Sequence, residues 1–171
     1  MPQRLPREDL VAMGVTEGDM YKNILVYLDN PEAAETTIGQ VEELANHFDS
    51  HIILAQVVAP ESNGVNRWAG AFDAEAPAMD AESMLARWRA KLAEHGVGAH
   101  VSVLPGYDSV AETIIAHARA HRIDLIVMPR QLNTELLGWS AEGVTEQVIR
   151  TAPCDVLVAR EQELLDSYFR W

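Results

Sequence analysis

Five short apolar segments, separated by stretches with helical periodicity, constrain the fold of this chain most strongly. Two of them, Asn23–Leu28 and His51–Val58, are almost uninterrupted apolar runs, as expected of strands buried on both faces of a parallel sheet. Further strands are expected at Ala99–Leu104, Asp124–Met128 and Asp155–Ala159. Strands that alternate with helices indicate an α/β fold, in which helices cover both faces of a parallel sheet through right-handed crossovers.

The segments between the strands carry signals for helix starts. Asn30 can cap a helix, and Pro31 fits its first turn. Ser109 and Glu112 have the spacing of a capping box. We expect the last helix to run from about Ser140 to Thr151, between the final two strands.

The pattern predicts one domain with an extension at each end. Residues 1–20 are polar and contain two prolines and two glycines, so we interpret them as an N-terminal extension. The domain itself is expected over residues 21–160. Residues 161–171 form a tail with apolar residues at helical spacing, and we expect it to dock on the domain or on a partner; these are Leu164, Leu165, Tyr168 and Phe169.

Charge and composition exclude several classes of function. The 171 residues are 48% hydrophobic, which is ordinary for a globular protein, and no apolar run approaches the roughly 20 residues that span a bilayer. A net charge of −13 repels nucleic-acid phosphates and anionic membranes, so we expect neither as a partner. The single cysteine, Cys154, rules out an internal disulfide and is typical of a reducing compartment. We therefore expect a cytoplasmic protein.

Four of these segments together resemble the universal stress protein family. They are NILVYLD (Asn23–Asp29), HIILAQVV (His51–Val58), IDLIVM (Ile123–Met128) and VTEQVIRTAPCDVLVAR (Val144–Arg160). The last is the most specific, and the resemblance covers residues 22 to 160. It implies a three-layer α/β/α fold around a five-stranded parallel sheet with the strand order 3-2-1-4-5.

The resemblance also implies a dimer joined through the fifth strands. Physical reasoning agrees, because an unpaired apolar edge strand invites association and two-fold pairing would satisfy it. The residues of the predicted interface are Asp155, Val156, Leu157, Val158 and Ala159.

The loop after the fourth strand departs from the family pattern. Nucleotide-binding members carry G-x2-G-x9-G-(S/T) there, and the four positions fall on Pro129, Leu132, Glu142 and Gly143. All three glycines and the hydroxyl are therefore replaced. Pro129 has no N–H to offer a phosphate, and Leu132 blocks close backbone approach. The sequence predicts that the chain does not bind ATP.

Glu142 suggests a further obstacle to a triphosphate. If Ser140 caps the last helix, Glu142 lies in its first turn, where exposed N–H groups favour an anion. Our hypothesis is that the Glu142 carboxylate occupies the position that a phosphate would use.

Other positions of the implied pocket are retained. The crevice between the first and fourth strands is the switch point at which such sheets bind ligands. By resemblance, Asp29 and Val57 match positions that contact the base and its sugar, and Met128 and Val144 match positions that line the pocket. Asp29 has an alternative role as a turn or helix-start residue, and Arg130 an alternative as a solvated surface cation. The candidate crevice comprises Asp29, Val57, Met128, Arg130, Gly143 and Val144.

The remaining candidates for chemistry lack supporting residues. His117 and His121 have a spacing compatible with metal ligation, but the sequence supplies no evident third ligand, and both also suit a helix end. Cys154 is interpreted as a small core residue rather than a reactive thiol. The sequence contains no G-x-S-x-G, H-E-x-x-H or P-loop pattern. We therefore expect neither an enzyme nor a cofactor or metal.

Two functions remain open at this point. The first is a non-catalytic universal stress-type protein that does not bind ATP and acts as a homodimer, through protein contacts, in stress response or regulation. The second is a sensor of a small molecule or of AMP, ADP or cyclic AMP, bound in the same crevice in an altered mode.

Overall fold

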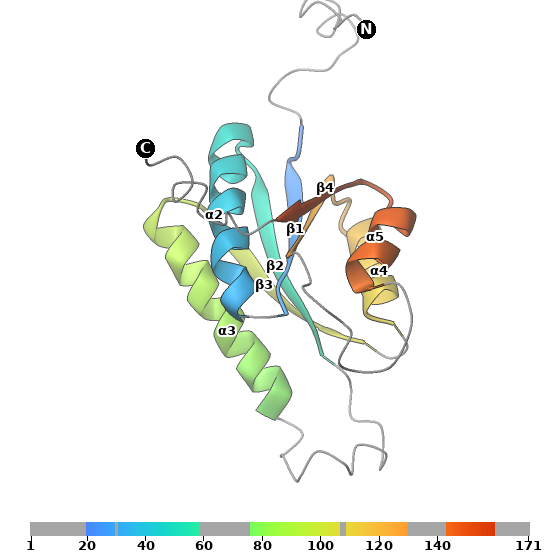
Figure 1. Ribbon diagram of the computed structural model, residues 1–171. Helices are drawn as coiled ribbons and strands as arrows, with labels where there is room; N and C mark the ends of the chain where they lie inside the picture. Colours follow the sequence, from blue (N-terminus) through green and yellow to red (C-terminus); the bar gives the residue numbers. More distant parts are fainter. Residues whose placement is uncertain (1–19, 30, 59–75, 107–108, 130–142, 160–171) are drawn as a thin grey trace, which may run out of the picture.

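The computed structural model describes residues 20–29, 31–58, 76–106, 109–129 and 143–159 (Figure 1). The strands are β1 (Asn23–Tyr27), β2 (His51–Val58), β3 (Ala99–Pro105), β4 (Leu125–Pro129) and β5 (Asp155–Ala159). The helices are α2 (Pro31–Phe48), α3 (Ala76–Glu94), α4 (Val110–Ala120) and α5 (Val144–Thr151).

The five strands form one parallel sheet in the order β3-β2-β1-β4-β5. Leu25 of the central strand β1 pairs with Ile53 of β2 on one side and with Ile126 of β4 on the other. The predicted fold class and strand order are therefore confirmed. Because the order reverses between β1 and β4, the switch point lies between the carboxyl ends of these two strands.

Helices cover both faces of the sheet, which gives three layers (Figure 1). Alternate residues of β1 point to opposite faces, since side chains alternate along a strand. Ile24 and Val26 pack in the core under α2 and α3. Leu25 and Tyr27 pack in the core under α4 and α5. All four are at most 4% exposed, which explains why β1 has a continuous apolar sequence.

The boundaries agree with the sequence at one helix and differ at another. Ser109 is the N-cap of α4, and its side chain accepts a hydrogen bond from the Glu112 N–H, as the capping pattern predicts. The predicted start of the last helix was wrong. Gly143 is the N-cap of α5, with extended backbone angles (φ −57°, ψ 156°) and no side-chain cap hydrogen bond. The helix therefore begins after the position predicted from Ser140.

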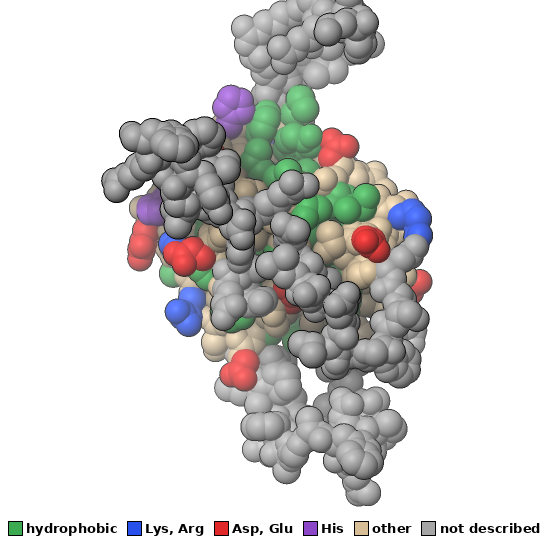
Figure 2. Space-filling model, viewed as in Figure 1, with side chains coloured by type: hydrophobic (Ala, Val, Ile, Leu, Met, Phe, Trp, Pro, Cys, Tyr) green, Lys and Arg blue, Asp and Glu red, His purple; other side chains and the backbone are tan. Residues whose placement is uncertain are grey.

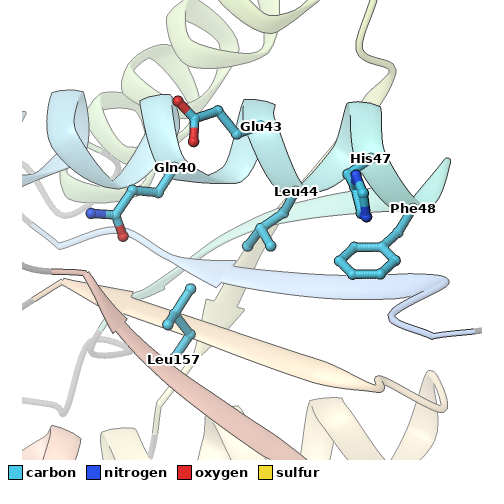
Figure 3. Close-up of a pocket in the computed structure, with 6 residues that line it drawn as sticks. All are labelled: Gln40, Glu43, Leu44, His47, Phe48 and Leu157. Carbon is cyan, nitrogen blue, oxygen red and sulfur yellow. The ribbon is translucent and has the colours of Figure 1, made fainter. Parts of the chain in front are cut away.

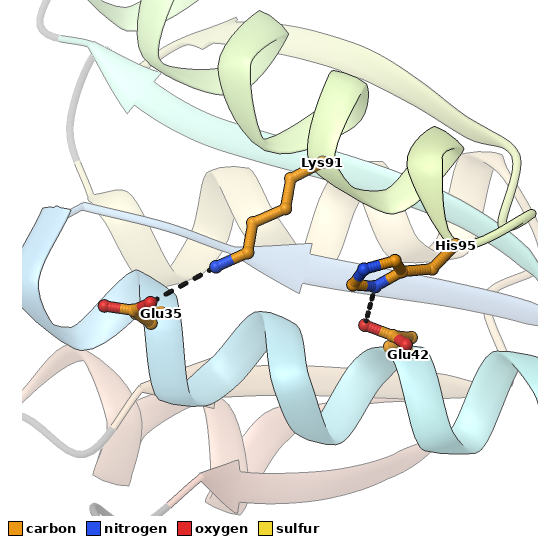
Figure 4. A network of polar contacts seen from close by, with 4 residues as sticks. All are labelled: Glu35, Glu42, Lys91 and His95. Atoms are coloured by element: carbon orange, nitrogen blue, oxygen red, sulfur yellow. Dashed lines mark hydrogen bonds and ion pairs between the residues drawn. The ribbon is translucent and has the colours of Figure 1, made fainter.

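Two polar contacts join α2 to α3 on the outside of the sheet (Figure 4). Lys91 Nζ lies 3.2 Å from Glu35 Oε1, and His95 Nδ1 lies 2.7 Å from Glu42 Oε2. All four side chains are substantially exposed, so each contact contributes little to stability. Among the described helices, none combines the length and apolarity that would span a membrane.

Candidate functional site

The candidate site lies at the carboxyl ends of β1 and β4. Asp29 follows β1 and is exposed. Tyr27, two residues earlier, is 4% exposed and packs in the core beneath α4 and α5. Burial, reinforced by the nearby Asp29 carboxylate, raises the pKa of Tyr27 above its usual value. The end of β1 therefore places a neutral phenol beside an acidic group.

The apolar positions of the crevice converge on one cluster. Met128 is fully buried in the core under α4 and α5, and Val57 and Val144 are partly buried against that same cluster. They come from β4, β2 and the first residue of α5. Val57, Met128 and Val144 therefore belong to the hydrophobic cluster beneath α4 and α5, and their part in ligand binding stays a prediction.

A glycine fixes how closely the chain approaches Val57. The Gly106 N–H, just after β3, donates a 2.8 Å hydrogen bond to the carbonyl of Val58. A Cβ atom added at Gly106 would overlap Cγ1 of Val57. Glycine therefore allows a close approach to Val57 that a larger residue would disturb.

The start of α5 changes the interpretation of the acidic residue before it. With Gly143 as the N-cap, Glu142 precedes the helix instead of lying in its first turn. That part of the Glu142 hypothesis is wrong, because a glycine with extended backbone, rather than Ser140, begins the helix. The side chains of Arg130, Leu132, Ser140 and Glu142 lie outside the described residues.

The first of the four positions of the phosphate-binding motif lies within the described residues. Pro129 is the last residue of β4, is buried, and pairs in register with Ala159 of β5. Its nitrogen carries no hydrogen, so it cannot donate to an anion at the end of the strand.

Two polar groups near the crevice were missed by the sequence argument. The phenol of Tyr27 is one, because in the sequence it is simply part of an apolar run. The other is Thr145, in the first turn of α5, whose Oγ1 is buried and has no hydrogen-bond partner among the residues that the structure describes. A buried hydroxyl without a partner is uncommon and costly, so it is available to a ligand or a water molecule.

The histidine pair lies at the end of α4, with His117 in its last turn and His121 as its C-cap. The His117 and His121 rings have centroids 4.1 Å apart. Burial, and then the neighbouring His121, lowers the pKa of His117, which favours its neutral form. Within the described ranges, no group of three or more His, Cys, Asp or Glu side chains is arranged to hold a metal ion.

Cys154 is half-buried against the core beneath α4 and α5. Burial raises the pKa of its thiol, and the Asp155 and Asp124 carboxylates add to the effect. Because the thiolate is the nucleophile, this environment disfavours reactivity.

Comparison with known proteins places these features in a family. The sequence model of the universal stress protein family matches residues 20–160. The chain is 28% identical over 146 residues to a universal stress protein of Staphylococcus aureus (strain USA300), covering 84% of this chain and 87% of that protein.

Solved structures show the same fold. Universal stress protein UspA from Lactobacillus plantarum superposes with a TM-score of 0.67 at 23% identity, covering 82% of this chain and 99% of that one. A universal stress protein from Archaeoglobus fulgidus, solved in complex with dAMP, superposes with a TM-score of 0.64 at 15% identity over 82% and 99% of the two chains. With the family model spanning most of its length, this chain belongs to the universal stress protein family.

Proposed function

We propose that this protein is a non-catalytic universal stress protein that does not bind ATP and acts through protein contacts, as a cytoplasmic homodimer, in stress response or regulation. The observation that carries the proposal is the replacement of every phosphate-gripping position after β4. Pro129, Leu132, Glu142 and Gly143 stand where the family motif has three glycines and a hydroxyl.

Two of these replacements act through the backbone itself. At the end of β4, Pro129 offers no N–H to a phosphate oxygen. Leucine at 132 disfavours the positive φ and the close approach that glycine permits. Since a phosphate grip consists mainly of backbone N–H groups, this chain loses a donor at Pro129 and close backbone approach at Leu132.

The proposed dimer uses the outer edge of β5. Among the described strands it pairs with β4 alone, so we assign its other edge to a second copy. Val156, Leu157 and Val158 are all partly exposed, and burying them against their two-fold copies would remove apolar surface from water. Light scattering at high concentration tests this, and a strict monomer would contradict the dimer.

Titration calorimetry with ATP tests the ligand part of the proposal. The full chain, purified without added nucleotide, is expected to give no binding heat with ATP at millimolar concentrations. Micromolar ATP binding by the unmodified protein would reject the proposal.

The second candidate function is a sensor of AMP, ADP, cyclic AMP or another small molecule. Two observations favour it. Val57, Met128 and Val144, which match pocket positions by the family resemblance, belong to one hydrophobic cluster beneath α4 and α5. Thr145 also holds a buried hydroxyl at the start of α5 that has no partner within the described part of the chain. The Archaeoglobus fulgidus protein of the same fold was solved in complex with dAMP, so a ligand with one phosphate is compatible with the fold.

The same calorimetric series separates the two functions. Saturable binding of AMP, ADP or cyclic AMP, lost on substituting Thr145→Val, would favour the sensor. Thr145→Ser keeps the hydroxyl and serves as the matched control. No binding of any of the nucleotides favours action through protein contacts.

A further inference from the structure

A groove runs between the second half of α2 and β5. It has a cavity volume of about 430 Å³ and is lined by Gln40, Glu43, Leu44, His47, Phe48 and Leu157. Figure 3 shows that Leu44 and Phe48 point from α2 toward β5, whereas Leu157 points from β5 toward α2. The floor of the groove is therefore apolar and bulky, and polar side chains form its rim.

The apolar surface continues beyond the groove through aromatic contacts. The ring of Phe48 packs edge-to-face against Tyr21, with centroids 5.3 Å apart, and against His47, at 4.7 Å. Phe48 and Tyr21 both remain partly exposed, and the adjacent Met20 is 43% exposed. Figure 2 shows hydrophobic side chains gathered at this end of the molecule, where α2 ends and β1 begins. Such a surface suits an aromatic and aliphatic partner.

The chain itself supplies a segment of this kind. Residues 160–171 follow β5 directly, and all but Arg160 lie outside the 20–160 match to the family. Their apolar side chains recur at the spacing that lines one face of a helix; these are Leu164, Leu165, Tyr168 and Phe169. An isolated helix of this length is marginal in water, so it requires a surface on which to pack.

Length and direction both fit the groove. β5 ends at Ala159, two residues after Leu157 in the groove floor. The groove extends along α2 from Gln40 to Phe48, which is about 12 Å of helix at 1.5 Å per residue. Two or three residues reverse the chain after Ala159, and the remaining nine or so then span roughly 14 Å as a helix.

We propose that residues 160–171 fold back on their own chain and place their apolar face in the α2–β5 groove. The docked segment covers Leu44, Phe48 and Leu157 on the α2 side of the sheet. It leaves the outer backbone edge of β5 open, so the inference does not depend on the dimer.

A second groove, between α4 and α5, fits this segment poorly. It has a similar volume of about 440 Å³, but its apolar lining consists of Ala111, Ile115 and Ala116. The rest of its lining is polar or charged; it comprises Glu112, Arg119, Gln147, Arg150 and Thr151. Two alanines and one isoleucine offer less apolar area to Tyr168 and Phe169 than the leucines and aromatic ring of the α2–β5 groove.

Hydrogen exchange on the full-length chain tests the proposal with matched substitutions. Phe169→Asp places a charge on the apolar face of the segment, whereas Ser167→Asp places the same charge away from it. We expect Phe169→Asp to speed amide exchange in residues 40–48 roughly tenfold, because a docked aromatic residue is lost, and to leave residues 111–119 unchanged. Ser167→Asp is expected to leave both regions as they are. Equal exchange of residues 40–48 in the native chain and in Phe169→Asp would overturn the proposal, as would a change confined to residues 111–119.

A disulfide cross-link identifies which chain supplies the segment. In a Cys154→Ala background, His47→Cys and Trp171→Cys are combined, which keeps Phe169 intact, and the full-length protein is oxidised. A cross-linked species of monomer mass is expected. A covalent dimer would show that the segment docks on a second copy, and the absence of any cross-link would show that the groove does not hold it. Either result overturns docking within one chain.

Discussion

Adding a methyl group at Gly106 is predicted to destabilise the protein through a single neighbour, Val57. The new Cβ would overlap Cγ1 of Val57, whereas its next neighbours, Thr113 Oγ1 and the Val58 carbonyl, lie at ordinary contact distances of 3.7 and 3.8 Å. Valine is stiff at χ1, and Val57 packs against the core beneath α4 and α5, so it cannot rotate away freely. Gly106→Ala is therefore expected to cost about 1–3 kcal/mol of unfolding free energy.

The double substitution makes this reasoning refutable. In a Val57→Ala background the overlapping methyl is gone, and alanine restricts the unfolded chain more than glycine does. Gly106→Ala should then be neutral or stabilising by up to about 0.5 kcal/mol. Urea denaturation of the four proteins of the cycle measures the coupling, which we expect to be about 1–3 kcal/mol. The same cost of Gly106→Ala in both backgrounds would refute the steric account.

Three further predictions concern side chains away from the crevice. The pKa of His117 is lowered in the folded protein, so below its ordinary value of 6.5 the unfolded chain binds more protons. Stability should fall as the pH drops below about 6.5, and the fall should be smaller in His117→Gln when urea midpoints are compared from pH 7.5 to 5; parallel curves would contradict this. Cys154 should react with iodoacetamide at pH 8 more slowly than free cysteine, because burial raises its pKa, and faster in Asp155→Asn, which removes a nearby charge; an unchanged rate in the variant would show that Asp155 has no influence. Glu35→Gln removes the exposed contact with Lys91 and should cost about 0.5 kcal/mol or less; a loss above about 1 kcal/mol in urea denaturation would mean that this contact organises α2 against α3.

The strands of the sheet could be predicted because a strand that is buried on both faces has a continuous apolar sequence. Ile24, Leu25 and Val26 face cores on both sides, so an uninterrupted apolar run encodes a central parallel strand. The strand order required the family resemblance, since the apolar runs alone do not say which strands are neighbours. The Ser109 cap could also be predicted from the sequence, because it depends on residues only three apart.

The start of α5 could not be predicted from a local capping pattern. Ser140 is the better side-chain cap by propensity, but Gly143 begins the helix through its backbone conformation alone. Capping propensity compares residue types alone and contains no information about the path of the chain from β4 to α5. Because α5 begins later than predicted, Glu142 lies before its first turn. A carboxylate held in that turn is therefore no longer an argument against ATP binding. The replacements at Pro129 and Leu132 still disfavour ATP binding, because their effects do not depend on where α5 begins.

Sites that depend on tertiary neighbours could not be predicted from the sequence. The pKa of Tyr27 is raised by burial within the fold, and the Thr145 hydroxyl is buried with no partner in the described ranges. The α2–β5 groove brings Leu44 and Phe48 beside Leu157, which is more than a hundred residues away in the chain. Of the predicted crevice residues, Val57, Met128 and Val144 belong to one hydrophobic cluster, and their role in binding stays a prediction.

The central claim is that the substituted motif after β4 abolishes ATP binding, and titration calorimetry with ATP measures it directly. A matched variant restores the motif through Pro129→Gly, Leu132→Gly, Glu142→Gly and Gly143→Ser. We predict no binding heat from the native chain and saturable ATP binding by the restored variant. Micromolar ATP binding by the native chain would contradict the account.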